Sequence, residues 1–193
     1  MSSSTLIALV VFSFVSSITP GPNNIMLFAS GVNFGLYRTW PHAFGIAFGF
    51  GVLLLAVGLG VGAVVDRSVV VMALLKFLGG AYMIYRAWRI ATASGVESVE
   101  VGARPMTFFE AALFQWVNPK AWVMAITAMS AYTQEGDYRA NVIIVIVVFV
   151  LVNFPSVTCW AGFGQLLSGW LADPRRRRWF NLSMGGALVL SLC

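Results

Sequence analysis

Three long stretches without a Lys, Arg, Asp or Glu residue constrain the fold of this chain more than any other feature. They run from Met1 to Tyr37, from Thr39 to Val65 and from Ala140 to Ala172. Each is longer than the roughly 20 apolar residues that a helix needs to cross a bilayer core. Strands of a membrane barrel are shorter and alternate in polarity, so these stretches predict helices. Charged residues make up only 10% of the chain, against about 25% in soluble domains. The sequence therefore predicts an all-α integral membrane protein.

We expect a single membrane domain over residues 1–193 with six transmembrane helices. The N-terminal stretch lacks the basic start of a secretory signal, and its apolar run continues past any cleavage site, so it is taken as the first span. The last span is the shortest. The expected spans are Ser4–Asn33, Pro41–Val65, Val69–Ile90, Thr107–Tyr132, Ala140–Leu171 and Trp179–Cys193.

Basic residues gather in alternate loops and predict the orientation. Cytoplasmic loops of membrane proteins are enriched in Lys and Arg. The richer set of loops holds Arg38, Arg86, Arg89, Arg104 and Arg175–Arg178, whereas the other set holds Arg67, Arg139 and, at a span end, Lys76. The sequence thus predicts that both termini face outside. The net charge of +5 is explained by these loops and does not indicate nucleic-acid binding.

The two halves of the chain resemble each other weakly. Residues 77–81 of the third span (Phe-Leu-Gly-Gly-Ala) resemble residues 183–187 of the sixth (Ser-Met-Gly-Gly-Ala), and the first and fourth spans each contain a proline motif. With three spans per half, the second half must be inverted relative to the first. We therefore predict two inverted three-helix repeats, residues 1–95 and 105–193, an architecture typical of transporters.

The first proline motif is Thr19-Pro20-Gly21-Pro22-Asn23-Asn24. Pro20 disfavours helix at Thr19, and Pro22 suits the first position of a new helix. One helix should end with free carbonyl groups and a second should begin with free amides, near the middle or inner half of the bilayer. Opposed helix ends suit a zwitterion, with its carboxylate at the amides and its ammonium at the carbonyls. The alternative is a simple proline kink.

The second proline motif lies in the fourth span. It reads Gln115-Trp116-Val117-Asn118-Pro119-Lys120, in which Asn118 suits a helix cap and Pro119 a first helical residue. Lys120 is the one charge that we place deep in a span, and burying it alone would cost at least about 3 kcal/mol. It should therefore pair, either with the substrate carboxylate or with the free carbonyls near Thr19.

Further polar residues in the spans have a functional and a structural interpretation. Asn153 could line the pathway, or bond between helices, and Pro155 beside it suggests another local break. Glu110, three residues after Thr107, fits a capping box but could also take part in proton coupling. His42 fits the membrane interface, with a proton role as the weaker alternative. The two cysteines show no metal-binding or redox spacing, so we expect no metal and no cofactor.

The two motifs resemble those of the LysE/RhtB family of amino-acid exporters, and the length and six-span layout extend the resemblance over nearly the whole chain. The stretches Phe114–Lys120, Thr127–Ser130 and Cys159–Ala161 are similar to the subgroup that exports cysteine and O-acetylserine. The resemblance implies a secondary transporter in the bacterial inner membrane that exports small neutral amino acids, including threonine- or homoserine-like ones, by proton antiport. It implies a zwitterionic substrate and the lipid bilayer as partners, with a second copy of the chain, in a homodimer, as a further candidate partner.

Three other functions remain as alternatives. The chain could export basic amino acids, or it could be a channel for small solutes, because polar breaks also line pores. A membrane-embedded enzyme is disfavoured, because hydrolysis or group transfer normally needs clustered acids, histidines or a nucleophile beside a base.

Overall fold

The computed structural model describes residues 1–62, 68–92, 104–134 and 136–191, and within these ranges the chain is helical with no strand. The predicted span ends at Val65 and Cys193 lie outside the described residues. The elements are α1 (Ser3–Ile18), α2 (Pro22–Gly58), α4 (Val69–Ala91), α5 (Phe108–Phe114), α6 (Pro119–Tyr132), α7 (Tyr138–Ser168), the 3₁₀ helix η1 (Trp170–Ala172) and α8 (Pro174–Leu190).

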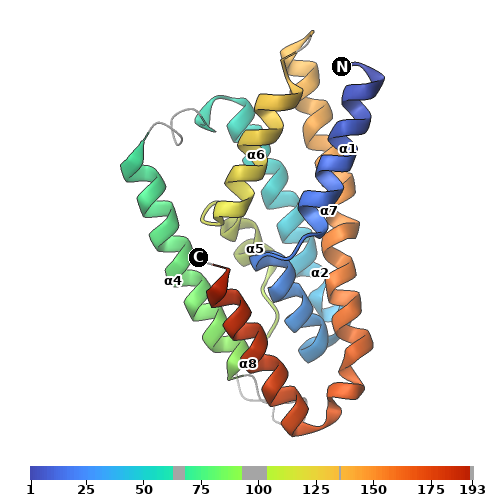
Figure 1. The fold of residues 1–193 in the computed structure, drawn as a ribbon, viewed down its shortest axis with the longest axis vertical. Helices are drawn as coiled ribbons and strands as arrows, with labels where there is room; N and C mark the ends of the chain where they lie inside the picture. The colour runs from blue at the N-terminus through green and yellow to red at the C-terminus, as the bar shows by residue number, and fades with distance from the viewer. Residues whose placement is uncertain (63–67, 93–103, 135, 192–193) are drawn as a thin grey trace.

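Helix α2 is two helical segments that meet at a sharp reversal. Gly35 has φ 78° and ψ 166°, a backbone conformation that favours glycine. The hydroxyls of Ser30 and Thr39 lie 3.0 Å apart, although nine residues of straight helix would separate them by about 13 Å. Figure 1 shows the chain descending before this point and ascending after it. The expected start of the second span at Pro41 is therefore wrong, since Pro41 lies inside the helix.

Helix α7 runs the full height of the bundle without interruption (Figure 1). It continues through Pro155, so the local break predicted there is wrong. A proline removes one backbone hydrogen bond, and membrane helices tolerate that loss. Among the described helices, α2 and α7 are long and apolar enough to cross a membrane, and α1 is a shorter apolar helix.

Glycines bring the helices into close contact. A methyl group on Gly31 would collide with the carbonyl group of Ala161, and one on Gly164 would collide with that of Phe28, so α2 and α7 approach backbone to backbone. The helices α2 and α5 meet in the same way at Gly45 and at Gly49. Small residues at helix interfaces allow this close approach in membrane proteins.

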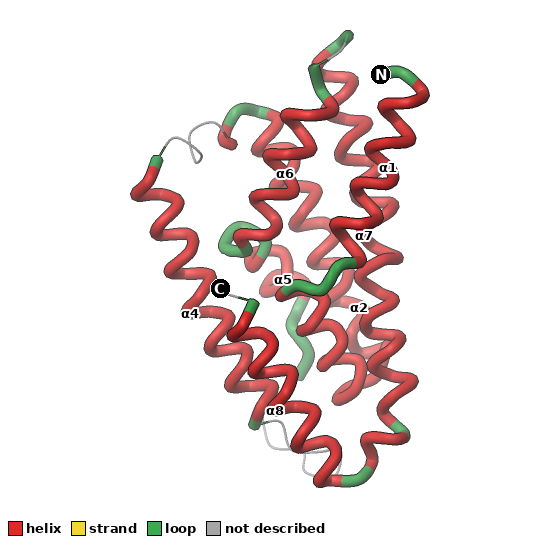
Figure 2. The backbone as a smooth tube through the Cα atoms, viewed as in Figure 1, coloured by secondary structure: helices red, strands yellow, loops and turns green. Residues whose placement is uncertain are grey.

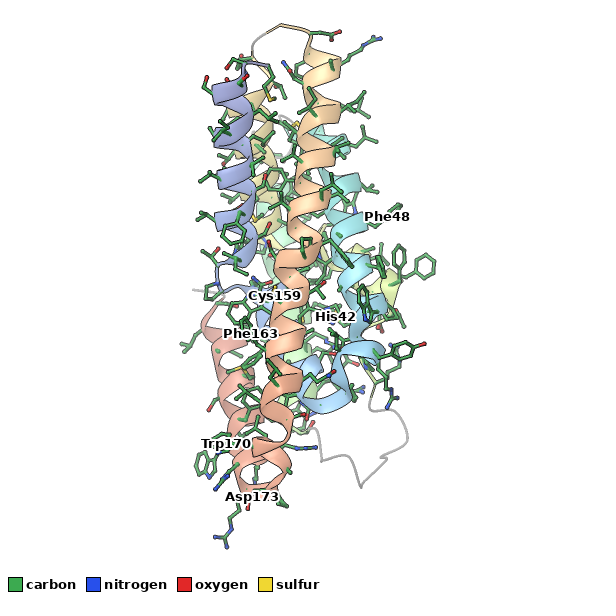
Figure 3. All side chains as sticks on the ribbon, turned by 90° about the vertical axis from the view of Figure 1, so that its right-hand side faces the viewer. His42, Phe48, Cys159, Phe163, Trp170 and Asp173 are labelled. Atoms are coloured by element: carbon green, nitrogen blue, oxygen red, sulfur yellow. The ribbon has the colours of Figure 1, made fainter. Side chains whose placement is uncertain are left out.

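Two apolar cores lie one above the other. The first core contains residues of α1, of α6, of the later part of α2 and of the beginning of α7. The second core contains residues of α4, α5 and α8, of the early and middle parts of α2, and of the later part of α7. The outer surface is also apolar: Phe48 and Phe163, labelled in Figure 3, are 59% and 57% exposed. Exposed aromatic residues of this kind suit a lipid environment rather than water.

Candidate functional site

The first interruption, here called the first break, comprises Thr19–Gly21. Helix α1 ends at Ile18, Thr19 is extended (φ −63°, ψ 144°), and α2 begins at Pro22. The predicted end and restart are confirmed. Figure 2 shows this break, and the interruption between α5 and α6, at the middle height of the bundle.

Side chains from two helices satisfy the carbonyls that the first break frees. The amide nitrogen Nδ2 of Asn24 donates to the carbonyl oxygens of Ser17 at 2.7 Å and Thr19 at 2.8 Å. The indole Nε1 of Trp160 on α7 donates to the carbonyl of Ile18 at 3.1 Å. The carbonyl end of α1 is thus already occupied by donors of the protein itself.

Lys120 supplies the remaining donor. Its ammonium donates to the carbonyl oxygen and the hydroxyl of Thr19, both at 2.9 Å, and more weakly to the Pro20 carbonyl at 3.4 Å. Gly21 makes room for it, because a methyl group there would lie 2.9 Å from Lys120 Cδ and 3.1 Å from Nζ. Gly21 itself is fully extended (φ −179°), so space rather than backbone freedom explains the glycine.

The second interruption, here called the second break, comprises Gln115–Asn118. Asn118 caps α6, its side chain accepting from the Lys120 amide at 3.1 Å, and Pro119 is the first helical residue. Both expectations are confirmed. The free carbonyl of Trp116 accepts from the indole of Trp122 at 2.8 Å.

A pair of amide side chains joins the two breaks. Asn23 Nδ2 donates to Gln115 Oε1 at 2.8 Å, and Gln115 Nε2 donates back to Asn23 Oδ1 at 3.2 Å. Gln115 also donates to the Ala111 carbonyl at 2.9 Å and is fully buried. Together with Lys120, this pair holds the N-terminal end of α2 against the start of α6.

The two breaks border one pocket. Predicted site residues that line it are Gly21, Asn23, Asn24, Gln115, Asn118, Lys120 and Asn153. The other predicted residues, Thr19, Pro20, Pro22 and Pro119, shape the breaks without lining the pocket. Sequence reasoning missed Ser16, Ser17, Ile46, Phe50, Ala121, Met124 and Val157, which also line it.

Two amide oxygens of residues that line the pocket have no hydrogen-bond partner among the described residues. Asn24 and Asn153 are 3% and 5% exposed, and the Oδ1 atom of each is buried without a hydrogen bond. Asn153 Nδ2 donates to the hydroxyl of Ser17 at 3.0 Å. A buried acceptor without a donor costs about 1–3 kcal/mol.

Glu110 and His42 do not line the pocket. Glu110 forms the predicted capping box with Thr107 and an ion pair with Arg104 at 2.7 Å. His42 is 1% exposed, and neither of its ring nitrogens has a hydrogen-bond partner. Its side chain lies in the interior of the bundle, and its place on α2 is labelled in Figure 3.

A helical membrane bundle in which two interrupted helices meet around a polar pocket is typical of membrane transporters. The chain belongs to the LysE family: the model of the LysE type translocator matches residues 14–192.

Two curated relatives illustrate the similarity. The cysteine/O-acetylserine efflux protein of Escherichia coli (strain K12) is 30% identical over 169 residues, covering 86% of this chain and 85% of the relative. The protein of the same name from Salmonella typhi is 30% identical over 164 residues, 83% of each chain. No solved structure matches the chain.

Proposed function

We propose that the protein exports small neutral amino acids or their derivatives, of the cysteine, O-acetylserine, threonine or homoserine type, from the bacterial cytoplasm across the inner membrane. The observation that carries the proposal is the pocket between the two breaks, with Lys120 as its cation and buried amide groups around it. The names of the curated relatives support the same class of substrate.

Lys120 and the beginning of α2 are suited to the substrate carboxylate. The Lys120 ammonium is held at the first break by Thr19, and the backbone amides of Asn23 and Asn24 open α2. Amides at a helix N-terminus and a nearby cation both favour an anion. None of the described residues that line the pocket is acidic, so a second cation on the substrate would find no counter-charge. Export of basic amino acids is therefore the less favoured alternative.

We also propose the six-span inverted repeat as the basis of alternating access. In Figure 1, α1 and the first part of α2 run downward whereas α5 and α6 run upward, and α4 and α8 run in opposite directions. Each repeat thus contributes one break, and the breaks meet at the middle height of the bundle. Rocking one repeat against the other would expose the pocket to one side at a time.

The basic ends of α4 and α8 support the proposed orientation. Arg86 and Arg89 lie near the lower end of α4, and Arg175–Arg178 begin α8 at the same end (Figure 1). By the positive-inside rule we expect this end to face the cytoplasm and the N-terminus to lie outside.

We propose proton antiport with His42 as the proton carrier. Both of its ring nitrogens are buried and have no hydrogen-bond partner among the described residues, whereas the carboxylate of Glu110 is engaged by Arg104 and Thr107. In proteoliposomes, His42→Gln should keep exchange of substrate across the membrane and lose acceleration by a pH gradient. Unchanged acceleration would contradict the role of His42.

The site is tested by transport in proteoliposomes loaded with mixed amino acids. Asn23→Ala, Asn24→Ala and Lys120→Ala should each abolish efflux while the protein still inserts. Ser156→Ala, which changes a buried residue of α7 outside the pocket lining, should retain efflux. Full efflux by all three site variants would refute the site. Saturation and counterflow distinguish a carrier from a channel, which would show neither.

A further inference from the structure

The unpartnered oxygens of Asn24 and Asn153 distinguish two kinds of acceptor in the pocket. The orientation of the Asn24 amide is fixed, because its Nδ2 donates to two carbonyl oxygens at 2.7 and 2.8 Å, and a reversed amide would place oxygen against oxygen. Its Oδ1 must therefore face elsewhere, and it meets no donor. Asn153 approaches from α7 and presents a second such oxygen.

The backbone carbonyls of the first break are less available. Those of Ser17, Ile18 and Thr19 already accept from Asn24 or Trp160, and Lys120 reaches the Thr19 carbonyl as well. A substrate ammonium at these carbonyls would have to displace the Lys120 ammonium or lie beside it, with repulsion between like charges. The two amide oxygens carry no such competitor.

We infer that Asn24 Oδ1 and Asn153 Oδ1 accept hydrogen bonds from the α-ammonium group of the substrate, while its carboxylate binds at Lys120. The inference rests on the proposed function and assigns the orientation of the substrate. Asn24 Nδ2 and Lys120 Nζ donate to the same Thr19 carbonyl oxygen, at 2.8 and 2.9 Å, so the acceptor side chain and the cation are close neighbours. An α-amino acid carries its ammonium and carboxylate on one carbon and fits such a short separation.

The substrate class follows from this arrangement. A compound with a free α-ammonium satisfies both buried oxygens, whereas an N-acylated or deaminated analogue leaves at least one unsatisfied. Sites built to bond a polar substrate group discriminate strongly against analogues that lack it. The side chain of the substrate is left to face the apolar lining of Ile46, Phe50 and Met124.

Counterflow of labelled L-cysteine in proteoliposomes tests the inference. The competitors are unlabelled L-cysteine and 3-mercaptopropionic acid, which has the same thiol and carboxylate but hydrogen in place of the ammonium. In the wild type, 3-mercaptopropionic acid should compete at least about tenfold more weakly, the ratio expected for losing a hydrogen bond to a charged group. O-acetyl-L-serine and its isomer N-acetyl-L-serine form a second pair with the same expectation.

The variants separate recognition of the ammonium from folding. Asn153→Leu removes the acceptor at similar size, so L-cysteine should bind about tenfold more weakly while 3-mercaptopropionic acid is unchanged. Asn153→Asp keeps an acceptor and should retain the discrimination. Ser156→Ala, on the same helix and outside the pocket lining, should leave both affinities unchanged.

Three outcomes would overturn the inference. Asn153→Leu could lower the affinities for L-cysteine and 3-mercaptopropionic acid equally, or it could leave the wild-type ratio between these two affinities unchanged. It could also abolish a requirement of transport for Na⁺, which would assign the amide oxygens to a metal ion. These outcomes leave export itself intact. If the wild type shows no counterflow with any amino acid, the proposed function fails, and the inference fails with it.

Discussion

Replacing Gly21 by alanine tests whether the position of Lys120 depends on the space that this glycine leaves. The backbone of Gly21 is extended (φ −179°, ψ 177°), so alanine adopts it without strain. The new methyl group, however, would lie 2.9 Å from Lys120 Cδ, whereas carbon atoms in ordinary contact are about 3.5–4.0 Å apart. The lysine must retract by about 0.6 Å or more, and its two 2.9 Å bonds to Thr19 then approach the limit of hydrogen bonding.

The size of the effect follows from those two bonds. Hydrogen bonds to a charged group contribute about 1.5–3 kcal/mol each. Lys120 is partly exposed and its stem is flexible, so we discount the loss to about 1–3 kcal/mol in total. A chain of this size loses about 2–4 °C in melting temperature per kcal/mol. Gly21→Ala should therefore lower the melting temperature of the detergent-purified protein by about 2–12 °C, followed by tryptophan fluorescence.

A double-mutant cycle decides whether the effect passes through Lys120. A Lys120→Ala background removes the three atoms nearest to the methyl group, Cδ, Cε and Nζ of Lys120, so Gly21→Ala should cause little further loss. An equal loss in both backgrounds would refute the explanation, because the glycine would then be needed for something other than the lysine.

Two further predictions concern packing and the capping box. Gly164→Ala should destabilise the protein by about 1–3 kcal/mol, because its methyl group would collide with the carbonyl of Phe28. The control is Gly162→Ala on the same helix, whose methyl group meets no atom within 4 Å and which should be neutral or stabilising. Equal melting temperatures of the two variants would contradict the close contact at Gly164. Glu110→Gln should cost no more than about 1–2 kcal/mol, because its ion pair with Arg104 is partly exposed; that cost should shrink at high salt in the same melting assay.

Features set by local chemistry could be predicted from the sequence. A proline lacks an amide hydrogen and fixes its own backbone angle, so the starts of α2 at Pro22 and α6 at Pro119 follow from neighbouring residues alone. The cap at Asn118 and the capping box at Glu110 are local for the same reason. The site could be located because both motifs interrupt otherwise apolar spans.

Features set by tertiary packing could not be predicted. The reversal at Gly35 depends on how α2 meets α7, and the sequence pattern favoured Pro41 instead. Met124 and Val157 lie in apolar stretches with no sign of which side faces the pocket. Only the structure shows that Thr19 is a partner of Lys120, because about a hundred residues of sequence separate Thr19 from Lys120.

The hydrogen bonds at the first break also have a consequence for the order in which the protein can be assembled. The break is synthesised early, but the donors to the Ile18 and Pro20 carbonyls belong to Trp160 and Lys120, which leave the ribosome much later. Unpaired carbonyls are costly in lipid. The nascent N-terminal half must therefore keep this segment in contact with water or the insertion machinery until most of the chain has been translated.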